Sequence, residues 1–451
     1  MLKRAERLDR LEEKYNLFYE EGGPEFMHIL ESARLEEVKE RDEVTSRKPP
    51  SDLLTKIKES LEDANYHVEN DLVRQFLLSA VTAAATGQIV LLSGPTGVGK
   101  TSLVSRMSTV LGVGPEESGR GVLPVRPSWI EPADLIGFHN ASTELYETTP
   151  FIDELTNAKR YAEAGELYFC VLDEMNLARI ENYGADLLAL LEKSRDAYRK
   201  GRPREVTIRL FSDLVAKGYT EELQELVSRR SEVDEDSEAA REIDRRIKRL
   251  DSQPSAELLL PPGFVLYGTL NADETTHPLS PKVKDRAFVL QLEAPLLDED
   301  ILANGNTSTP KTVWQLTQEF VDDLDPHAEL PKWARDSWDD IISWQEPYLH
   351  PMGIHLSHRF AEVFCYYILS VKALHITPRK KVGRRKIVGD FLAMKLLPWI
   401  SFHRSEKAAG METRKEDLLR KWADELDDYG SLKKTVQGIL DRGDLTYEYI
   451  R

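Results

Sequence analysis

Cysteine is scarce in this chain, because its 451 residues include only Cys170 and Cys365. Cys170 stands in an apolar run and Cys365 in a helical pattern, so no disulfide framework is expected and a reducing, cytoplasmic setting fits. Runs of ~18 apolar residues are missing, so neither a membrane-spanning helix nor a membrane partner is expected. The first residues, MLKRAERLDRLEEK, also lack the apolar centre of a signal peptide.

Zinc-type spacing is missing as well. The nearest grouping among the ten histidines is His350, His355 and His358, for which helix-entry and surface positions are favoured over a metal site. The formal charge of −18 argues against a surface that binds nucleic acid indiscriminately, although a local basic channel remains compatible with it. With 41% hydrophobic and 31% charged residues, the chain has the composition of a helix-rich soluble protein with room for two or three domains.

The most informative motif is IVLLSGPTGVGKT, residues 89–101. Its apolar start predicts a buried parallel strand, and a helix is expected from Ser102 to Leu111, ending before Gly112. Glycines let backbone N–H groups close around a phosphate, and the helix N-terminus adds positive partial charge. Lys100 can reach the β- and γ-phosphates, and the Thr101 hydroxyl can ligate Mg²⁺. The filled motif and its strand–loop–helix context disfavour an accidental glycine-rich turn. The expected nucleotide-binding residues are Gly94, Pro95, Thr96, Gly97, Val98, Gly99, Lys100, Thr101, Ser102 and Asp173.

Two further apolar runs deliver polar residues at their ends. Leu167–Leu172 predicts a buried strand that ends at Asp173 and Glu174. Asp173 can hold the Mg²⁺ shell beside the P-loop threonine, and Glu174 can polarise a water for attack on the γ-phosphorus. An acidic helix cap is the alternative. Phe264–Thr269 predicts the next strand, and Asn271 beyond it can orient the attacking water or sense the γ-phosphate.

A short helix that starts with proline is expected within Ser280–Ala287, leading into a strand over Phe288–Leu292. Arg286 at its end is expected to project from the side of the domain. In a ring, such an arginine would lie against a neighbour's γ-phosphate and act as an arginine finger. The alternative is an ion pair with Asp285 or Glu293.

Between two strand-prone segments, Glu205–Phe211 and Ala256–Leu260, the sequence has helical period and dense mixed charge over Ser212–Ser252. One interpretation is a β-hairpin whose tip has grown into a helical, coiled-coil excursion. The other is a solvated charged face with no partner, because mixed charge mainly indicates exposure.

The flanking regions are expected to be helical. Residues 1–50, which end at Pro49-Pro50, predict a charged helix that is either a docking arm or merely solvated. Asn70 is expected to cap a helix that ends at Gly87. After Pro295 long helical patterns continue to the end, and Arg359 belongs to one of them. The basic run Arg379–Lys386 predicts either contact with a phosphate backbone or a solvated inter-helix loop.

The order of these motifs resembles that of an AAA+ ATPase module followed by a lid. Three stretches, Arg126–Phe138, Leu172–Glu192 and Gly268–Ala287, are similar to the McrB branch, the NTPase motors of modification-dependent restriction systems, and so is the tail SLKKTVQGILDRGDLTYEYIR. The resemblance implies an α/β AAA+ P-loop core with a parallel sheet, an all-α lid and a helical hairpin insertion. The expected divisions are an arm (1–50), a core (51–295, with the insertion near 205–260) and a helical region (296–451).

By position, the resemblance assigns roles to individual residues. Gly94, Gly99, Lys100 and Thr101 would form Walker A, and Asp173 with Glu174 Walker B. Asn271 would be sensor 1, Arg286 the finger acting in trans and Arg359 the sensor 2 arginine; Thr101 and Asp173 would hold the metal. The chain departs from the family in two ways. It shows no large N-terminal domain that reads modified DNA, and its insertion is unusually long, so DNA recognition by this subunit is in doubt.

The expected function is a ring-forming NTPase that uses ATP or GTP with Mg²⁺, and the resemblance implies a homo-oligomer in the form of a hexamer. It would couple hydrolysis to translocation or remodelling of DNA, reached through a pore or partner, in a McrBC-like defence complex. No nuclease constellation is visible in the sequence, so a McrC-like subunit would cleave. The alternatives are a MoxR-like chaperone ATPase that remodels proteins and a nucleotide-gated scaffold. No residue discriminates ATP from GTP.

Overall fold

A computed structural model describes residues 48–113, 121–199, 206–234, 237–271, 277–293, 309–325, 328–441 and 446–448. The chain divides into two units, Met1–Thr45 and Ser46–Arg451, and every described element belongs to the second. The predicted N-terminal arm lies outside the described residues except for 48–50. The division predicted at residues 295 and 296 also falls outside them and stays a prediction.

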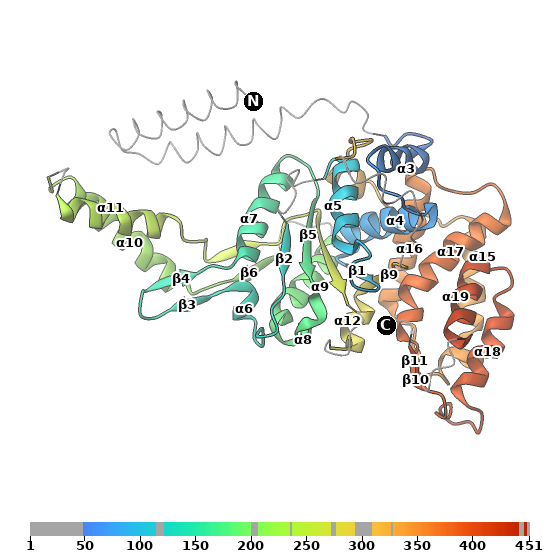
Figure 1. Cartoon of the computed structure of the whole chain (residues 1–451). Helices are drawn as coiled ribbons and strands as arrows, with labels where there is room; N and C mark the ends of the chain where they lie inside the picture. Colours follow the sequence, from blue (N-terminus) through green and yellow to red (C-terminus); the bar gives the residue numbers. More distant parts are fainter. Residues whose placement is uncertain are drawn as a thin grey trace. The chain divides into compact units, whose positions relative to one another are not determined.

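The central element is a five-stranded sheet in which all neighbours are parallel, in the order β2-β5-β8-β1-β9. Almost all residues of its four longer strands are buried, as expected when helices cover both faces of a parallel sheet. Figure 1 shows the sheet between its helices. The strands are β1 (Ile89–Ser93), β2 (Val122–Pro124), β5 (Tyr168–Asp173), β8 (Phe264–Leu270) and β9 (Ala287–Gln291).

Helices alternate with these strands along the chain. They are α3 (Leu53–Asp63), α4 (Asn70–Thr86), α5 (Lys100–Val110), α6 (Ala133–Ile136), α7 (Pro150–Glu163), the 3₁₀ turn η1 (Met175–Leu177), α8 (Ile180–Tyr183), α9 (Ala185–Arg199) and α12 (Pro281–Asp285). Helix α4 ends as expected, with Gly87 in the left-handed conformation at φ 63°. Its start differs from the expectation: Asn70 is the first helical residue, and the capping position belongs to Glu69, whose side chain makes no capping bond.

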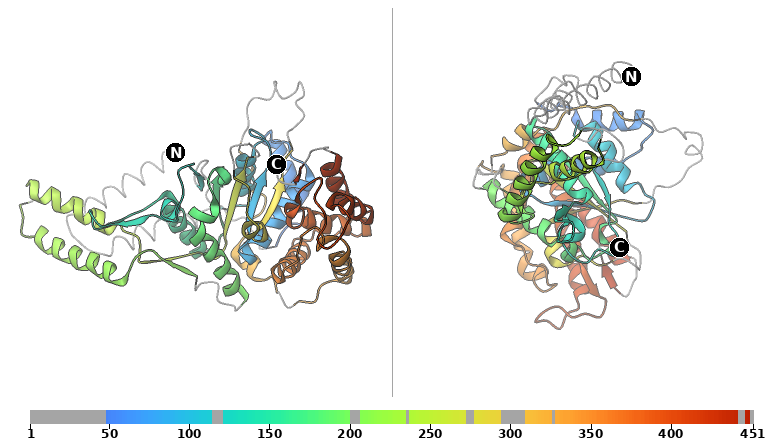
Figure 2. Two further views of the ribbon diagram at one scale, coloured as in Figure 1. Left: turned by 90° about the horizontal axis from the view of Figure 1, so that it is seen from below. Right: turned by 90° about the vertical axis from the view of Figure 1, so that its left-hand side faces the viewer.

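The insertion is a β-hairpin with a helical tip, as one of the two sequence interpretations predicted. Strands β6 (Thr207–Arg209) and β7 (Glu257–Leu259) pair antiparallel, and α10 (Asp213–Arg230) packs along α11 (Glu238–Asp251) between them. Arg230 and Arg246 of the two helices bind Asp244 and Glu222 of the opposite helix. Figures 1 and 2 show the helix pair reaching away from the sheet. A second small hairpin consists of β3 (Phe138–Asn140) and β4 (Leu145–Glu147).

The C-terminal region is helical, apart from the antiparallel pair β10 (Ser401–His403) and β11 (Thr446–Glu448). Its core includes Trp314, Trp344 and Trp422, each at most 5% exposed. The helical elements are α14 (Gln318–Asp322), α15 (Lys332–Ser343), the π-helical η3 (Gln345–Leu349), α16 (His358–Ala373), α17 (Lys381–Lys395), η4 (Leu397–Trp399), α18 (Lys415–Glu425) and α19 (Gly430–Asp441).

Helix α17 corrects the prediction for the basic run Arg379–Lys386. The run is not an inter-helix loop, because α17 begins within it at Lys381. Its basic side chains find acidic partners on other elements: Lys381 binds Asp428 and Lys386 binds Asp71. Several of the basic side chains that could bind a phosphate backbone are thus already paired with carboxylates of the same chain.

The same helix joins the C-terminal region to the α/β core. Asp390 of α17 is 1% exposed and accepts hydrogen bonds from Arg74 Nε at 2.9 Å and Gln75 Nε2 at 3.1 Å, both in α4. Burial raises the pKa of the Asp390 carboxyl, and the Arg74 charge opposes that rise. In addition, α17 packs on the edge strand β9.

The predicted fold class is confirmed. The chain has an α/β core around a parallel sheet, a helical hairpin insertion and a helical C-terminal region. None of the helices among the described residues is long and apolar enough to cross a membrane.

Candidate functional site

The P-loop connects β1 to α5 at the carboxyl end of β1. Its glycines provide the backbone shape that the motif predicts, since Gly97 and Gly99 have φ angles of 84° and 85°. A Cβ atom at Gly94 would overlap the carbonyl oxygen of Leu292, so only glycine fits there. The Lys100 amine lies over the loop and donates to the carbonyl oxygens of Gly94 and Pro95, both at 2.9 Å. The loop therefore brings together a cation, a helix N-terminus and glycine amides.

Asp173 lies beside this loop, at the carboxyl end of β5. Its Oδ1 accepts hydrogen bonds from the hydroxyl groups of Thr101 and Thr269, each at 2.7 Å. Thr101 is on the first turn of α5 and Thr269 is on β8, so the carboxylate joins three elements. The motifs predict that Thr101 and Asp173 lie together, whereas nothing in the sequence singles out Thr269.

Glu174 follows directly and has a left-handed backbone, with φ 54°. A non-glycine residue in this region is uncommon and is held there by surrounding contacts. Here its amide N–H donates to Thr269 Oγ1 at 2.8 Å, and its Oε1 accepts from Asn271 Nδ2 at 2.8 Å. The turn directs the Glu174 carboxylate toward Asn271 at the end of β8, near the contact between Thr101 and Asp173.

Asn271 is itself positioned by a residue that the sequence analysis missed. Asn176, 7% exposed, donates from Nδ2 to the Asn271 carbonyl at 2.8 Å and accepts from the Asn271 N–H at 3.2 Å. Tyr183 in turn donates from its hydroxyl to the carbonyl of Met175 at 2.9 Å. The η1 turn is therefore tied to β8, which fixes the distance between the acidic pair and the asparagine.

Tyr66 is another residue beside the loop that the sequence analysis did not predict. A Cβ at Gly99 would lie 3.6 Å from its hydroxyl oxygen, and the Arg106 guanidinium lies 4.8 Å from its ring centre. Burial raises the pKa of Tyr66, and Arg106 opposes this rise. Tyr66 thus lines one side of the P-loop with a neutral phenol and a nearby cation.

The donor set fits a divalent metal of the magnesium type. The Thr101 hydroxyl and Asp173 carboxylate are hard oxygen donors, and they meet where the P-loop helix begins. Elsewhere among the described residues, no group of three histidine, cysteine or acidic side chains is arranged to hold a metal, and this includes the histidines near residue 350.

The structure places Arg286 differently from the expectation that it projects from the domain. Its residue is 8% exposed, and its guanidinium is paired with Glu192 of α9 in the same chain. The alternative expectation, an ion pair with Asp285 or Glu293, also differs from the observed pairing with Glu192. Nonlocal packing explains this, because Glu192 is 94 residues away in sequence.

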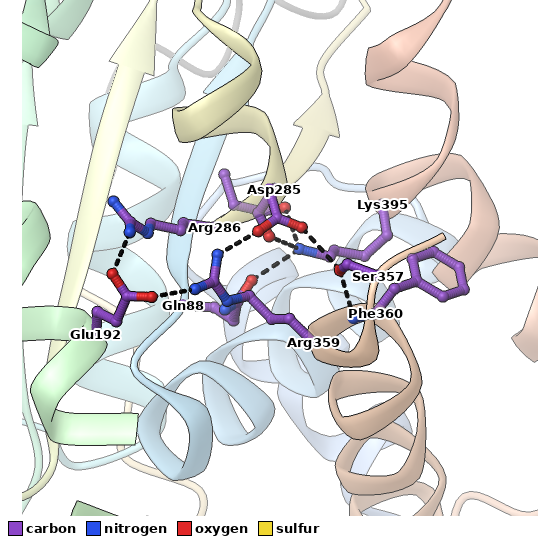
Figure 3. A network of polar contacts seen from close by, with 9 residues as sticks. Gln88, Glu192, Asp285, Arg286, Ser357, Arg359, Phe360 and Lys395 are labelled. Carbon is purple, nitrogen blue, oxygen red and sulfur yellow. Dashed lines mark hydrogen bonds and ion pairs between the residues drawn. The ribbon is translucent and has the colours of Figure 1, made fainter. Parts of the chain in front are cut away.

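Arg286 and Arg359 both lie near the amino ends of the strands, whereas the P-loop lies at the carboxyl end of β1. The Arg286 carbonyl accepts from the N–H of Ile89, the first residue of β1, whereas Gly94 follows its last. At roughly 3.3 Å per residue, the five steps from Ile89 to Gly94 separate these two points by about 16 Å. Arg359 lies with Arg286, because it also binds Glu192 (Figure 3). Neither arginine is positioned to contact a phosphate in the loop of its own chain.

Comparison with solved structures finds a number of matching chains, one of which is described here. No family model and no curated protein sequence matches the chain. A crystal structure of a candidate ATPase from Cytophaga hutchinsonii is 12% identical, covers 75% of this chain and 81% of its own, and superposes with a TM-score of 0.35. At that similarity, the comparison adds nothing to the geometry. What the residues themselves build is a glycine-rich loop between a strand and a helix, with a hydroxyl–carboxylate pair beside it, on a parallel sheet.

Proposed function

We propose that this protein is a Mg²⁺-dependent nucleoside triphosphatase, acting on ATP or GTP, that works as a ring. The observation that carries the hydrolytic part is the continuous chain of contacts from Thr101 through Asp173 and Thr269 to Glu174 and Asn271. These contacts support the proposal, because they bring a hydroxyl–carboxylate pair suited to Mg²⁺ and a carboxylate suited to accept a proton to adjacent strand ends.

Each of these side chains has a defined task in hydrolysis. Lys100 would donate from its amine to oxygens of the β- and γ-phosphates, and Thr101 with Asp173 would hold the metal. Mg²⁺, when bound, neutralises the charge that develops on the phosphate oxygens. Glu174 accepts a proton from the attacking water, and Asn271 orients the Glu174 carboxylate by its hydrogen bond.

The ring rests on a different observation, the position of Arg286 and Arg359. An arginine that completes the charge balance at the γ-phosphate is worth 10³–10⁵ in rate in comparable enzymes. Both arginines lie near the amino ends of the strands, at the opposite end from the P-loop of their own chain. A neighbouring copy, packed with its P-loop against this end, would receive them.

The biological setting that we propose follows from the resemblance of three stretches to the McrB branch. In it, the ring translocates or remodels DNA in a McrBC-like defence complex, with a separate nuclease subunit. An alternative setting is remodelling of protein, as in MoxR-like ATPases. The insertion favours it, because α10 has no buried residue and exposes Leu214 and Val227 by 80% and 54%.

Turnover assays separate these settings. Phosphate release is measured with ATP and with GTP, alone and with duplex DNA, with the candidate nuclease subunit or with an unfolded protein substrate. A McrBC-like motor is stimulated by DNA or the nuclease subunit, whereas a chaperone ATPase is stimulated by unfolded protein. Absence of turnover with either nucleotide under all of these conditions contradicts the enzyme assignment itself.

A further inference from the structure

One carboxylate bridges the two arginines near the amino ends of the strands. Glu192 of α9 binds the Arg286 guanidinium with Oε2, and with Oε1 it accepts a bond from Arg359 Nη2 at 2.6 Å. Figure 3 shows Glu192 between the two side chains; Arg286 directly follows α12, and Arg359 lies at the start of α16. The contact therefore ties the α/β core to the helical region.

Glu192 is the most solvent-exposed of the three side chains in this contact. The Arg286 and Arg359 side chains are 10% and 12% exposed, whereas the Glu192 side chain is 39% exposed. The Glu192 side of the contact is therefore the more accessible to solvent or to another molecule.

A second carboxylate holds Arg359 in place from the inner side. Asp285 pairs with Arg359 through Oδ2, and its Oδ1 accepts from the Ser357 hydroxyl at 3.1 Å. Beside it, the Lys395 amine donates to the Asp285 carbonyl at 2.8 Å and to the Ala287 carbonyl at 3.0 Å. If Glu192 moved away, these contacts would still orient Arg359.

The arrangement around Glu192 has the chemistry of an anion site. Arginine forks bind planar carboxylates and phosphates through the same N–H groups, and phosphate offers more acceptor oxygens and more charge. Two arginines that meet on one carboxylate can therefore meet on one phosphate group. In the chain as it stands, the charges of the pair are balanced by Glu192 and Asp285.

We propose that Glu192 is a displaceable counter-ion, which occupies the arginine pair in the separate chain and gives way to the terminal phosphate of a nucleotide bound by a neighbouring copy. This rests on the ring of the proposed function and adds its regulation. Glu192 is a positioning residue: it keeps the two arginines together before assembly and opposes assembly by the cost of its displacement. Completion of the site is thereby coupled to the arrival of a nucleotide-loaded neighbour.

The test is the dependence of turnover on protein concentration in the full chain, with Mg²⁺ and saturating nucleotide. Glu192→Gln removes the charge while keeping the shape of the side chain. We expect the concentration for half-maximal specific activity to fall by roughly tenfold, the change expected when one competing charge-assisted bond is weakened. A structural role would instead lower activity at every concentration, and that result would overturn the proposal.

The chain offers a matched control. Asp340 pairs with Arg385 at side-chain exposures of 40% and 12%, nearly those of Glu192 and Arg286, but among the C-terminal helices. Asp340→Asn should leave the half-maximal concentration unchanged. An equal shift in Asp340→Asn and Glu192→Gln would show a general charge effect and contradict the proposal.

Thermal melting checks that the variants fold. If Glu192→Gln does not fold, Glu192→Asp takes its place: it retains the charge but is too short to bridge both arginines, and a smaller shift in the same direction is expected. A wild-type chain whose specific activity does not depend on concentration at any dilution contradicts the ring itself. A concentration-dependent wild type with unshifted Glu192 variants contradicts only the role of Glu192.

Discussion

At the scale of single residues, Thr269 organises the acidic side of the site. Its hydroxyl donates to Asp173 and accepts from the Glu174 amide, both within 2.8 Å. It therefore holds both the Asp173 carboxylate, our proposed metal ligand, and the left-handed turn at Glu174, our proposed general base. Because outer-shell partners of this type set the orientation of metal ligands, their loss is felt in catalysis.

The first prediction is that Thr269→Val lowers turnover by about 10–100-fold, the range seen for loss of an outer-shell partner. The measurement is steady-state phosphate release over a range of Mg²⁺ concentrations, in which the Mg²⁺ requirement should also rise. Thr86→Val is the control, because Thr86 is likewise fully buried but bonds only within α4. Equal activity of Thr269→Val and wild type would show that the bridge has no catalytic importance.

The sequence was sufficient to locate most of the residues at this site but not the contacts that fix them. The spacing of Gly94–Thr101 can be recognised from the sequence alone. Asp173, Glu174 and Asn271 come at the ends of apolar runs, and the carboxyl ends of these parallel strands lie together. Thr269 lies inside such a run, where its hydroxyl looks like an ordinary strand residue. Its role depends on the pairing of β8 beside β5, which the sequence does not display.

Lys395 provides a second residue-scale prediction. Burial lowers the pKa of its amine to about 7; Asp285 opposes the shift and Arg359 adds to it. Between pH 7 and 10.5 the unfolded chain therefore binds more protons at this site than the folded chain, so stability rises with pH in that window. At 1.36 kcal/mol per pKa unit, the full effect is roughly 5 kcal/mol.

Thermal or denaturant unfolding of wild type and Lys395→Met, at pH 7 and pH 9, measures this contribution. The stability of the wild type relative to the variant should increase toward pH 9. A difference independent of pH would mean that the three oxygens around the amine, from Gln88, Asp285 and Ala287, keep it charged throughout.

At the scale of elements, the junction of α4 and α17 depends on a buried ion pair. Asp390 has a side-chain exposure of 1% and is satisfied by Arg74 and Gln75. Removal of one partner leaves a buried charge without compensation, which typically costs about 3–5 kcal/mol. We therefore expect Arg74→Met to reduce the free energy of unfolding by about 3 kcal/mol, as measured by denaturant titration.

Two further variants make this prediction specific. Lys56→Met removes an exposed pair with Asp52 and should cost less than about 1 kcal/mol. Adding Asp390→Asn to Arg74→Met should restore part of the loss, since the buried charge is then gone. An Arg74→Met variant as stable as Lys56→Met would show that the pair does not hold the junction.

The sequence predicted helices and strands correctly where adjacent residues carry the signal. It failed where residues far away along the chain determine the structure. The apolar strands and the proline-started α12 carry their signal in adjacent residues, as does the helical period of the insertion. The basic run Arg379–Lys386 was compatible with a solvated loop in the sequence, because its acidic partners Asp71 and Asp428 lie far away along the chain. The same reason accounts for Arg286, whose observed partner is Glu192.

At the scale of the whole molecule, a ring requires that one chain complete the site of the next. This can be tested by mixing two variants that are each inactive alone. Lys100→Ala subunits lack a working P-loop but retain the arginine, and Arg286→Ala subunits have the reverse defect. If the finger acts between chains, mixed assemblies should regain part of the wild-type turnover, because some interfaces unite the two intact halves.

Phosphate release by the mixture, compared with each variant alone at the same total concentration, measures this recovery. A mixture of Lys100→Ala with Asp173→Asn, both defective on the P-loop side, is the control and should remain inactive. If the Arg286→Ala chains alone retain full activity, no arginine is needed from a neighbour at this position, and the ring mechanism is wrong.

The most direct test of the central claim, hydrolysis at the site around Thr101 and Glu174, is the fate of bound nucleotide in Glu174→Gln. The variant is incubated with Mg²⁺ and radiolabelled ATP or GTP, separated from free nucleotide, and the bound species is identified. We predict intact triphosphate retained on Glu174→Gln, diphosphate formed by the wild type, and no retention by Lys100→Ala. Diphosphate formed by Glu174→Gln at the wild-type rate would contradict the account.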